Sequence, residues 1–260
     1  MTSTRTGAWR LDGQLALITG ASKGLGAAMA REFAALGADL VLAARGGDGL
    51  ETLAAEIQAD APDCEIELVV ADLSENDGRD AVVEVIGRRG KLQILVNNVG
   101  TNIRKPMAAI SQVEFLEIQR TNVTSHFEMS RRLLPCLEAG APASVINNAS
   151  VAGLTHLRTG APYGMSKAAL IQMTKNCAVE WAPLGIRVNA IAPWYIDTPL
   201  ARQVMDDPDY KAAILERTPM GRIGEPEEVA RVAAFLCMPG ASYVTGQCLA
   251  IDGGFSVYGF

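Results

Sequence analysis

The segment that decides the fold lies near the start of the chain, where residues 15–26 read LALITGASKGLG. The first five of these residues are typical of a buried β-strand, and apolar residues recur at helical spacing from Leu25 onward. Glycines between the two allow the backbone to turn tightly and approach a pyrophosphate, while the first turn of the helix offers unpaired N–H groups. The segment therefore predicts a dinucleotide-binding turn, with a turn that holds no ligand as the alternative.

The same alternation of short β-rich runs and longer helical patterns continues to the end of the chain. The expected strands are residues 15–19, 39–44, 67–70, 94–97, 144–147, 188–192 and 248–251. The clearest helical patterns cover residues 112–137, 163–181 and 226–237. Because most of the strands are apolar on both faces, the sequence predicts a single α/β domain of the Rossmann type. We expect a doubly wound, parallel, seven-stranded sheet with helices on both faces.

The domain limits follow from where these patterns begin and end. Residues 1–10 are expected to form an N-terminal arm, and residues 11–260 a single dinucleotide-binding catalytic domain. In residues 193–219, turn residues interrupt a weak helical pattern, so we expect an irregular insert there, next to the substrate.

Composition excludes several classes of partner. A net charge of −6 gives no general attraction to nucleic acid or to an anionic membrane surface. No apolar run approaches the roughly 18 residues that a membrane span needs. The five cysteines are far apart and lie in apolar surroundings, and no cluster of His, Cys and Asp suggests a metal. We expect a soluble, cytoplasmic protein with no metal, nucleic-acid or membrane partner.

The end of the second strand bears on which dinucleotide is bound. It reads Ala43-Ala44-Arg45, without the carboxylate that holds the ribose 2′-OH in NAD-binding folds. An arginine instead offers several donors for a 2′-phosphate, and Lys23 in the glycine turn could add a second positive charge. The sequence favours NADP(H), the alternative being that both are solvated surface cations.

A tyrosine and a lysine indicate the chemistry. Tyr163 and Lys167 lie four residues apart in a helical stretch, and so on one face of the helix. A nearby cation favours the phenolate and lowers the tyrosine pKa toward the working range of an acid–base catalyst. Ser150, just past a strand, can hydrogen-bond a substrate oxygen that Tyr163 protonates. This arrangement needs no metal.

Taken together, these residues resemble the short-chain dehydrogenase/reductase family. The glycine spacing matches the family pattern T-G-x-x-x-G-x-G, and Ser150, Tyr163 and Lys167 match its triad in order and spacing. Residues 96–106 and 192–200 are similar to the tropinone reductase-like subgroup. The resemblance implies that Tyr163 donates the proton and Ser150 orients the carbonyl. It further implies that Lys167 binds the nicotinamide ribose and lowers the tyrosine pKa, and that Asn122 holds a water.

The resemblance also implies a set of cofactor-binding residues. They are Gly20, Ser22, Lys23, Gly24, Leu25, Gly26, Arg45, Asp72, Leu73, Asn98, Gly100, Tyr163, Lys167, Pro193, Ile196 and Thr198. A purely structural role for Asn97 and Asn98 stays open. Trp194 stands where the family usually has glycine, which could bring an aromatic surface into the site.

Candidates for substrate contact lie on three loops. They are Asn102, Arg104, Thr155, His156, Leu157, Trp194, Tyr195 and Leu200. For Arg104 and His156 an ordinary surface role is the alternative. The aromatic residues suggest a largely apolar pocket.

We expect NADPH-dependent, reversible reduction of a small apolar or cyclic ketone. The alternatives are an NAD-dependent dehydrogenase of a secondary alcohol or sugar, and a dinucleotide-sensing protein that performs no chemistry. The family is mostly tetrameric, and residues 253–260 are unusually apolar for a free tail. A homo-oligomer, tetramer or dimer, is therefore expected.

Overall fold

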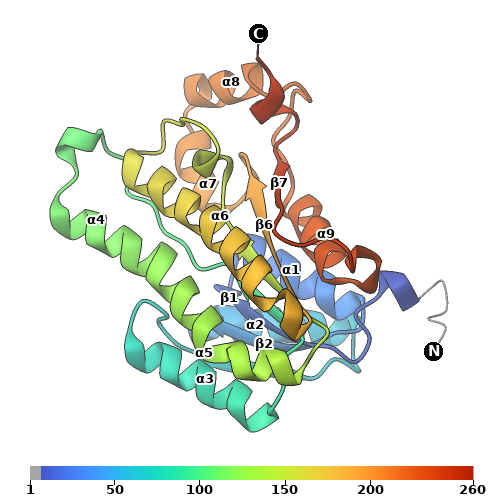
Figure 1. Cartoon of the computed structure of the whole chain (residues 1–260). Helices are drawn as coiled ribbons and strands as arrows, with labels where there is room; N and C mark the ends of the chain where they lie inside the picture. The colour runs from blue at the N-terminus through green and yellow to red at the C-terminus, as the bar shows by residue number, and fades with distance from the viewer. Residues whose placement is uncertain (1–6, 260) are drawn as a thin grey trace.

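The computed structural model describes residues 7–259 and has one seven-stranded parallel sheet, in the order β3-β2-β1-β4-β5-β6-β7 (Figure 1). The strands are β1 Leu15–Thr19, β2 Asp39–Ala44, β3 Ile66–Val70, β4 Ile94–Asn97, β5 Ala143–Asn148, β6 Ile186–Pro193 and β7 Cys248–Ile251. The chain starts in the middle of the sheet, winds to one edge through β3, and returns to build the other edge from β4. The predicted doubly wound fold is confirmed.

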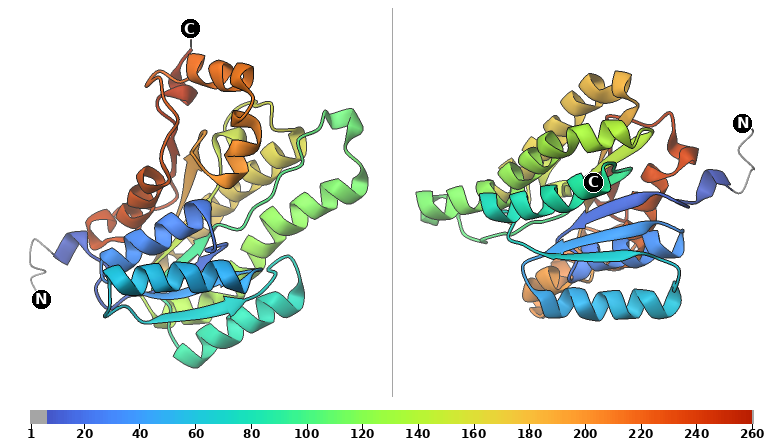
Figure 2. Two further views of the ribbon diagram at one scale, coloured as in Figure 1. Left: turned by 180° about the vertical axis from the view of Figure 1, so that it is seen from behind. Right: turned by 90° about the horizontal axis from the view of Figure 1, so that it is seen from below.

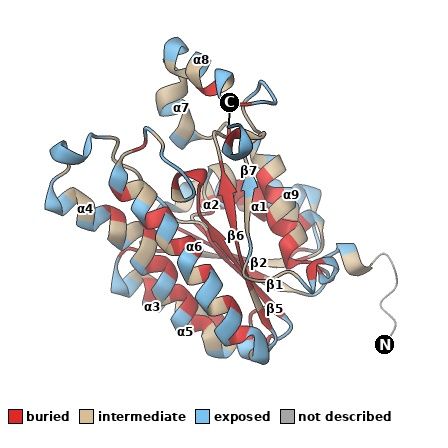
Figure 3. Cartoon of the chain, turned by 45° about the horizontal axis from the view of Figure 1, so that its top comes forward, coloured by how far each residue is buried: buried red, intermediate tan, exposed pale blue. Residues whose placement is uncertain are grey.

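Helices cover both faces of the sheet (Figure 2). They are α1 Gly24–Ala35, α2 Gly47–Asp60, α3 Asn76–Arg89, α4 Gln112–Gln119, α5 Ser125–Ala139, α6 Ala161–Trp181, α7 Pro199–Met205, α8 Pro208–Glu216 and α9 Pro226–Cys237. Successive strand residues point to opposite faces, so Ile18 packs with α1, α2 and α9 while Leu17 packs with α3, α5 and α6. The five central strands are therefore buried from both sides, as Figure 3 shows in red, whereas the edge strands β3 and β7 are more exposed.

Two elements differ from the sequence-based expectation. The helix expected over residues 112–137 is divided by a π-helical turn, Arg120–Thr124, between α4 and α5. Within the insert expected to be irregular, residues 199–216 instead form α7 and α8. Each of these helices starts with a proline and is capped, by the Thr198 and Asp207 side chains respectively. Such local capping explains how so weak a periodic pattern still folds as helix.

Of the expected N-terminal arm, residues 1–6 lie outside the described part of the chain. Gly7–Trp9 form a 3-10 turn, and Trp9 stacks on Phe235 of α9 with ring centroids 6.1 Å apart. Among residues 7–259, no helix is both long and apolar enough to cross a bilayer.

Candidate active site

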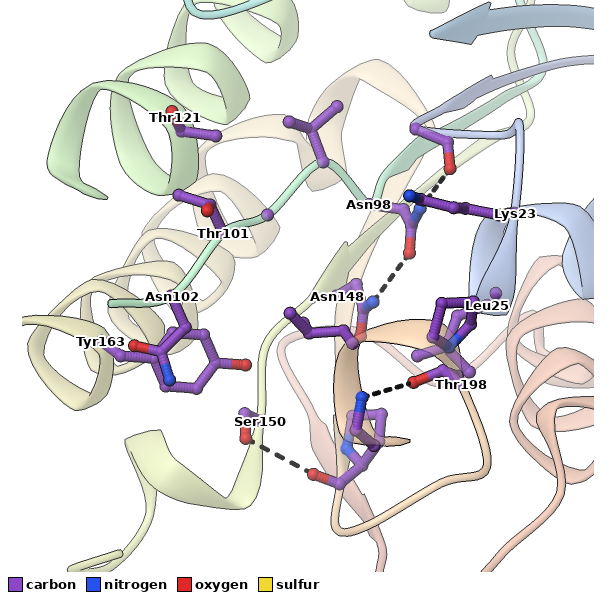
Figure 4. A pocket seen from close by; sticks show the side chains of 18 of the residues that line it. Lys23, Leu25, Asn98, Thr101, Asn102, Thr121, Asn148, Ser150, Tyr163 and Thr198 are labelled. Atoms are coloured by element: carbon purple, nitrogen blue, oxygen red, sulfur yellow. Dashed lines mark hydrogen bonds between the residues drawn. The ribbon is translucent and has the colours of Figure 1, made fainter. Parts of the chain in front are cut away.

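A cavity of about 560 Å³ opens at the carboxyl ends of the strands. It runs from the turn between β1 and α1, past β4 and β5, to α7, and Figure 4 shows part of its wall. This is the place where strand order reverses in a doubly wound sheet and where such folds bind ligands. Except for Gly26, all of the cofactor-binding residues predicted above line it.

The glycine turn explains the exception. Gly20 and Gly24 have φ of +65° and +59°, a backbone conformation that favours glycine. Gly26 faces away from the cavity, and a Cβ there would lie 2.3 Å from the Gly20 carbonyl oxygen. Gly26 therefore allows α1 to pack closely on the turn, which directs the start of the helix toward the cavity.

A chain of hydrogen bonds holds this turn against the neighbouring strands. The Thr19 hydroxyl donates to the Val96 carbonyl (3.0 Å) and accepts from the Asn98 amide N–H (2.9 Å). The Asn98 side chain donates to the Thr19 carbonyl (2.9 Å). It accepts from Asn148 (2.8 Å), as Figure 4 shows. Asn98 thus lines the cavity and is also part of its frame.

Asn97 is structural. It is buried and donates to Asn147 of β5 and to Ser130 of α5. Asn97 therefore lies in the core, whereas Asn98 lies on the cavity wall.

Two cations lie at the nucleotide end of the cavity. Lys23 and Arg45 are both exposed on its rim, and no ion pair involves either among the described residues. Asp72 lies beside them. Burial raises the pKa of this carboxyl, but hydrogen bonding to Ser74 and the charge of Arg45 bring it below its usual range.

The three residues of the predicted triad meet at the middle of the cavity. Ser150 follows β5, where its hydroxyl accepts from the Ala152 amide (3.1 Å) and faces the Pro193 carbonyl (3.4 Å). Lys167 is buried and donates to the Asn148 carbonyl (2.7 Å), with Nζ 5.6 Å from the centroid of the Tyr163 ring. These contacts fix the serine and the lysine close to the phenol.

The electrostatics differ from the expectation. Burial raises the pKa of Tyr163, and the Ser150 hydroxyl and the Arg104 charge oppose this only in part. Burial also lowers the pKa of Lys167 to about 8. The predicted depression of the tyrosine pKa by Lys167 is therefore not found in this arrangement. The phenol carries its proton at neutral pH, as a proton donor must, and its raised pKa makes it a weaker acid than a free tyrosine.

Asn122 lies in the π-helical turn and is buried outside the cavity wall. Its amide nitrogen donates to the Thr101 carbonyl (2.9 Å) and to Ser166 (3.0 Å), and its oxygen accepts from the Thr101 N–H (2.8 Å). Both amide hydrogens are used, so this side chain holds the loop that starts at Thr101. Its predicted role in holding a water stays a prediction.

The substrate end of the cavity is built from the loops after β4, β5 and β6 and from the start of α7. Asn102, Arg104, Leu157, Trp194, Tyr195 and Leu200 line it. Trp194 stacks on Phe255, with ring centroids 3.7 Å apart, and donates to the Thr218 hydroxyl (3.0 Å). His156 and Thr155 are exposed and do not reach the wall, so these two candidates are corrected.

Sequence reasoning missed two residues. Asn148 connects the glycine turn to Lys167, and its position at the end of a buried strand was a signal that could have identified it. His126 of α5 is buried under the cavity, with Nε2 2.8 Å from the Val99 carbonyl. Burial lowers its pKa to about 3. No sequence signal distinguishes it from an exposed helical histidine.

Comparison with known proteins agrees with this geometry. Residues 20–256 match the family model described as enoyl-(acyl carrier protein) reductase. A tropinone reductase homologue of Arabidopsis thaliana is 42% identical over 254 residues, which cover 97% of this chain and 96% of the homologue. The similarity to tropinone reductase-like proteins predicted from the sequence is thereby confirmed.

Two solved structures share the fold and carry different dinucleotides. The Pseudomonas aeruginosa RhlG/NADP active-site complex is 35% identical, with a TM-score of 0.89, over 96% of this chain and 98% of that one. A 7α-hydroxysteroid dehydrogenase complexed with NADH and 7-oxo glycochenodeoxycholic acid is 32% identical, with a TM-score of 0.91, over 97% and 98%. Similarity of fold therefore leaves the choice between NADP and NAD to the residues of this chain.

Proposed function

The chain belongs to the short-chain dehydrogenase/reductase family, and from that premise we propose that it reduces a small ketone with NADPH. The observation that carries the proposal is that Tyr163, Ser150 and Lys167 line one cavity, with Lys167 Nζ 5.6 Å from the centroid of the Tyr163 ring. The reverse direction, oxidation of the secondary alcohol, uses the same groups.

The residues present fit a dinucleotide. The glycine turn opens the backbone beside the N-terminus of α1, where a pyrophosphate would be bound by unpaired N–H groups. When bound, the reduced nicotinamide supplies the hydride. Lys23 and Arg45 would hold a 2′-phosphate, and the absence of a carboxylate at the end of β2 supports NADPH over NADH.

In the proposed mechanism, protein side chains place the carbonyl and move one proton. The Ser150 hydroxyl would orient the carbonyl oxygen, and Tyr163 would donate its proton to that oxygen as the alcohol forms. Lys167, held by Asn148, would bind the ribose hydroxyls with its remaining donors and, if protonated, stabilise the phenolate left behind. Positioning and charge are thus the contributions of the protein.

Binding measurements test the cofactor assignment without any substrate. We expect NADPH to bind at least tenfold more tightly than NADH, about 1.4 kcal/mol, in titrations that follow nicotinamide fluorescence. Arg45→Ala should remove most of that preference. Arg88→Ala is the matched control, because Arg88 is an exposed arginine of α3 that pairs with Glu67 of β3 and Glu84 of α3. Equal or tighter binding of NADH would favour the alternative, an NAD-dependent alcohol or sugar dehydrogenase.

We also propose that the protein self-associates as a dimer or tetramer in the cytosol. Large apolar side chains are exposed on the long helices, among them Val113, Phe127 and Val179, and on the C-terminal segment at Val257. The five cysteines are free, in keeping with a reducing compartment. A monomer in sedimentation analysis would contradict the assembly.

A further inference from the structure

An arginine without an acidic partner lies at the substrate end of the cavity. Arg104 is partly buried, and its Nε is fully buried without a hydrogen-bond partner. Within residues 7–259 its side chain makes one hydrogen bond, a long one to Gln203 (3.4 Å). Among residues 7–259 no carboxylate forms an ion pair with it. A buried donor of a charged group is costly to leave unpaired, so it indicates a position where a ligand acts as acceptor.

Asn102 presents a second unsatisfied group on the same loop. Both its amide nitrogen and its amide oxygen are buried without a partner, and the side chain lines the cavity together with Tyr163 (Figure 4). The loop itself is fixed, because Asn122 binds both the N–H and the carbonyl of Thr101. These donors are therefore held in place before any ligand arrives.

The local charge is positive although the chain is acidic overall. The charges of Arg104 and Arg158 both act on the phenol of Tyr195, and that of Arg104 acts also on Tyr163. Arg158 lies over the ring of Tyr210, 4.7 Å from its centroid. Glu117, the acidic residue on this part of the wall, is exposed and forms no ion pair within the described chain. In a protein of net charge −6, such a cluster indicates selection of an anion.

We propose that the ketone carries a carboxylate, which Arg104 and Asn102 bind while the carbonyl lies at Tyr163. The planar fork of an arginine matches a carboxylate, with two parallel N–H···O bonds. The apolar part of the substrate would contact Leu157 and Trp194 on the same wall. A keto acid, NADPH and a proton become a hydroxy acid and NADP⁺, and the carboxylate itself is unchanged. The reduction rests on the proposed function, whereas the carboxylate site does not.

The test compares one skeleton with and without its charge. The probes are 4-oxocyclohexanecarboxylate and its methyl ester, titrated by calorimetry into the full chain saturated with NADP⁺, so that no reaction occurs. We expect the acid to bind at least tenfold more tightly than the ester. Arg104→Leu should reduce that ratio to below twofold, and Arg104→Lys should give an intermediate ratio because it keeps the charge and loses the fork. Arg131→Ala, an exposed arginine paired with Glu128 on α5, should keep the wild-type ratio.

Two results overturn the carboxylate site: an ester that binds as tightly as the acid in the wild type, or an acid preference that survives in Arg104→Leu. If neither probe binds, the site is likewise rejected. NADPH consumption with the same pair separates the two proposals. Acid that binds selectively but is not reduced contradicts the reductase and leaves the carboxylate site standing. Ester reduced faster than acid contradicts the carboxylate site and leaves the reductase standing.

Discussion

The two ends of the cavity are built in opposite ways. At the nucleotide end, polar side chains such as Thr19 and Asn98 are satisfied by other protein groups, and the backbone of the glycine turn faces the cavity together with the exposed Lys23 and Arg45. At the substrate end, Asn102 and Arg104 line the cavity and have buried polar atoms without hydrogen-bond partners. The hydrogen bonds of the nucleotide end are thus formed before a ligand binds, which suits a cofactor that is the same in every reaction. The substrate end is complete only when its ligand is bound, so selectivity for the substrate is concentrated there.

The largest expected effect is at Tyr163, where the two ends meet. Tyr163→Phe removes the proton donor and keeps the ring, so turnover of any ketone that the wild type reduces should fall by about 10³-fold. NADPH affinity should change less than threefold, because the nucleotide end is not altered. Steady-state NADPH consumption and a fluorescence titration measure the two quantities. Tyr243→Phe, on a fully exposed tyrosine, is the control. Turnover near normal in Tyr163→Phe would refute the mechanism.

The next effect tests whether the nucleotide end is as rigid as its contacts indicate. In Gly26→Ala the new methyl group would overlap the Gly20 carbonyl, 2.3 Å away, and we expect a loss of about 2–3 kcal/mol in the free energy of unfolding. NADPH binding should weaken with it. Gly87→Ala in α3 is the matched control, because nothing lies within 4 Å of its Cβ and helical alanine should add roughly 0.5–1 kcal/mol. Urea denaturation measures both, and equal stability of the two variants would mean that the turn adapts.

The smallest effect concerns His126, which supports the loop between the two ends. Its folded pKa of about 3 lies below the unfolded value near 6.5, so its stabilising contribution is complete above pH 6.5 and is lost as pH falls toward 3. Between pH 7 and pH 5 the wild type should lose about 2 kcal/mol of unfolding free energy that His126→Gln does not lose. His156→Gln, on the exposed histidine, should behave as wild type. Identical pH dependence in all three proteins would place the His126 ring in contact with water.

Sequence predicted best what depends on neighbours along the chain. The strand and glycine turn of residues 15–26 form a local pattern, and a parallel sheet covered on both sides follows from strands that are apolar on both faces. Ser150, Tyr163 and Lys167 could be identified because a motif fixes their spacing. Their meeting in one cavity agrees with that motif.

What sequence could not provide depends on three-dimensional surroundings. The raised Tyr163 pKa comes from burial, which no motif reports. The π-helical turn at Asn122 is associated with hydrogen bonds to Thr101 on another loop. The exposure of His156 and the burial of His126 depend on which side of a loop or helix faces the sheet. In α7 and α8, local signals outweighed a weak apolar pattern: the caps and the proline at the start of each helix explain why these residues are helical.

The stack of Trp194 on Phe255 has a practical consequence for anyone who prepares this protein. Phe255 belongs to the C-terminal segment, which lies beside α8 at the top of Figure 1, and Arg217 packs over both Phe255 and Tyr258. An affinity tag fused after residue 260 would therefore be attached to the segment whose Phe255 packs against Trp194 in the cavity wall. A tag placed before Trp9 would join the chain at the C-terminal end of α9, and Trp9 does not line the cavity. Assays of substrate choice should use protein tagged at that second position, or with the tag cleaved.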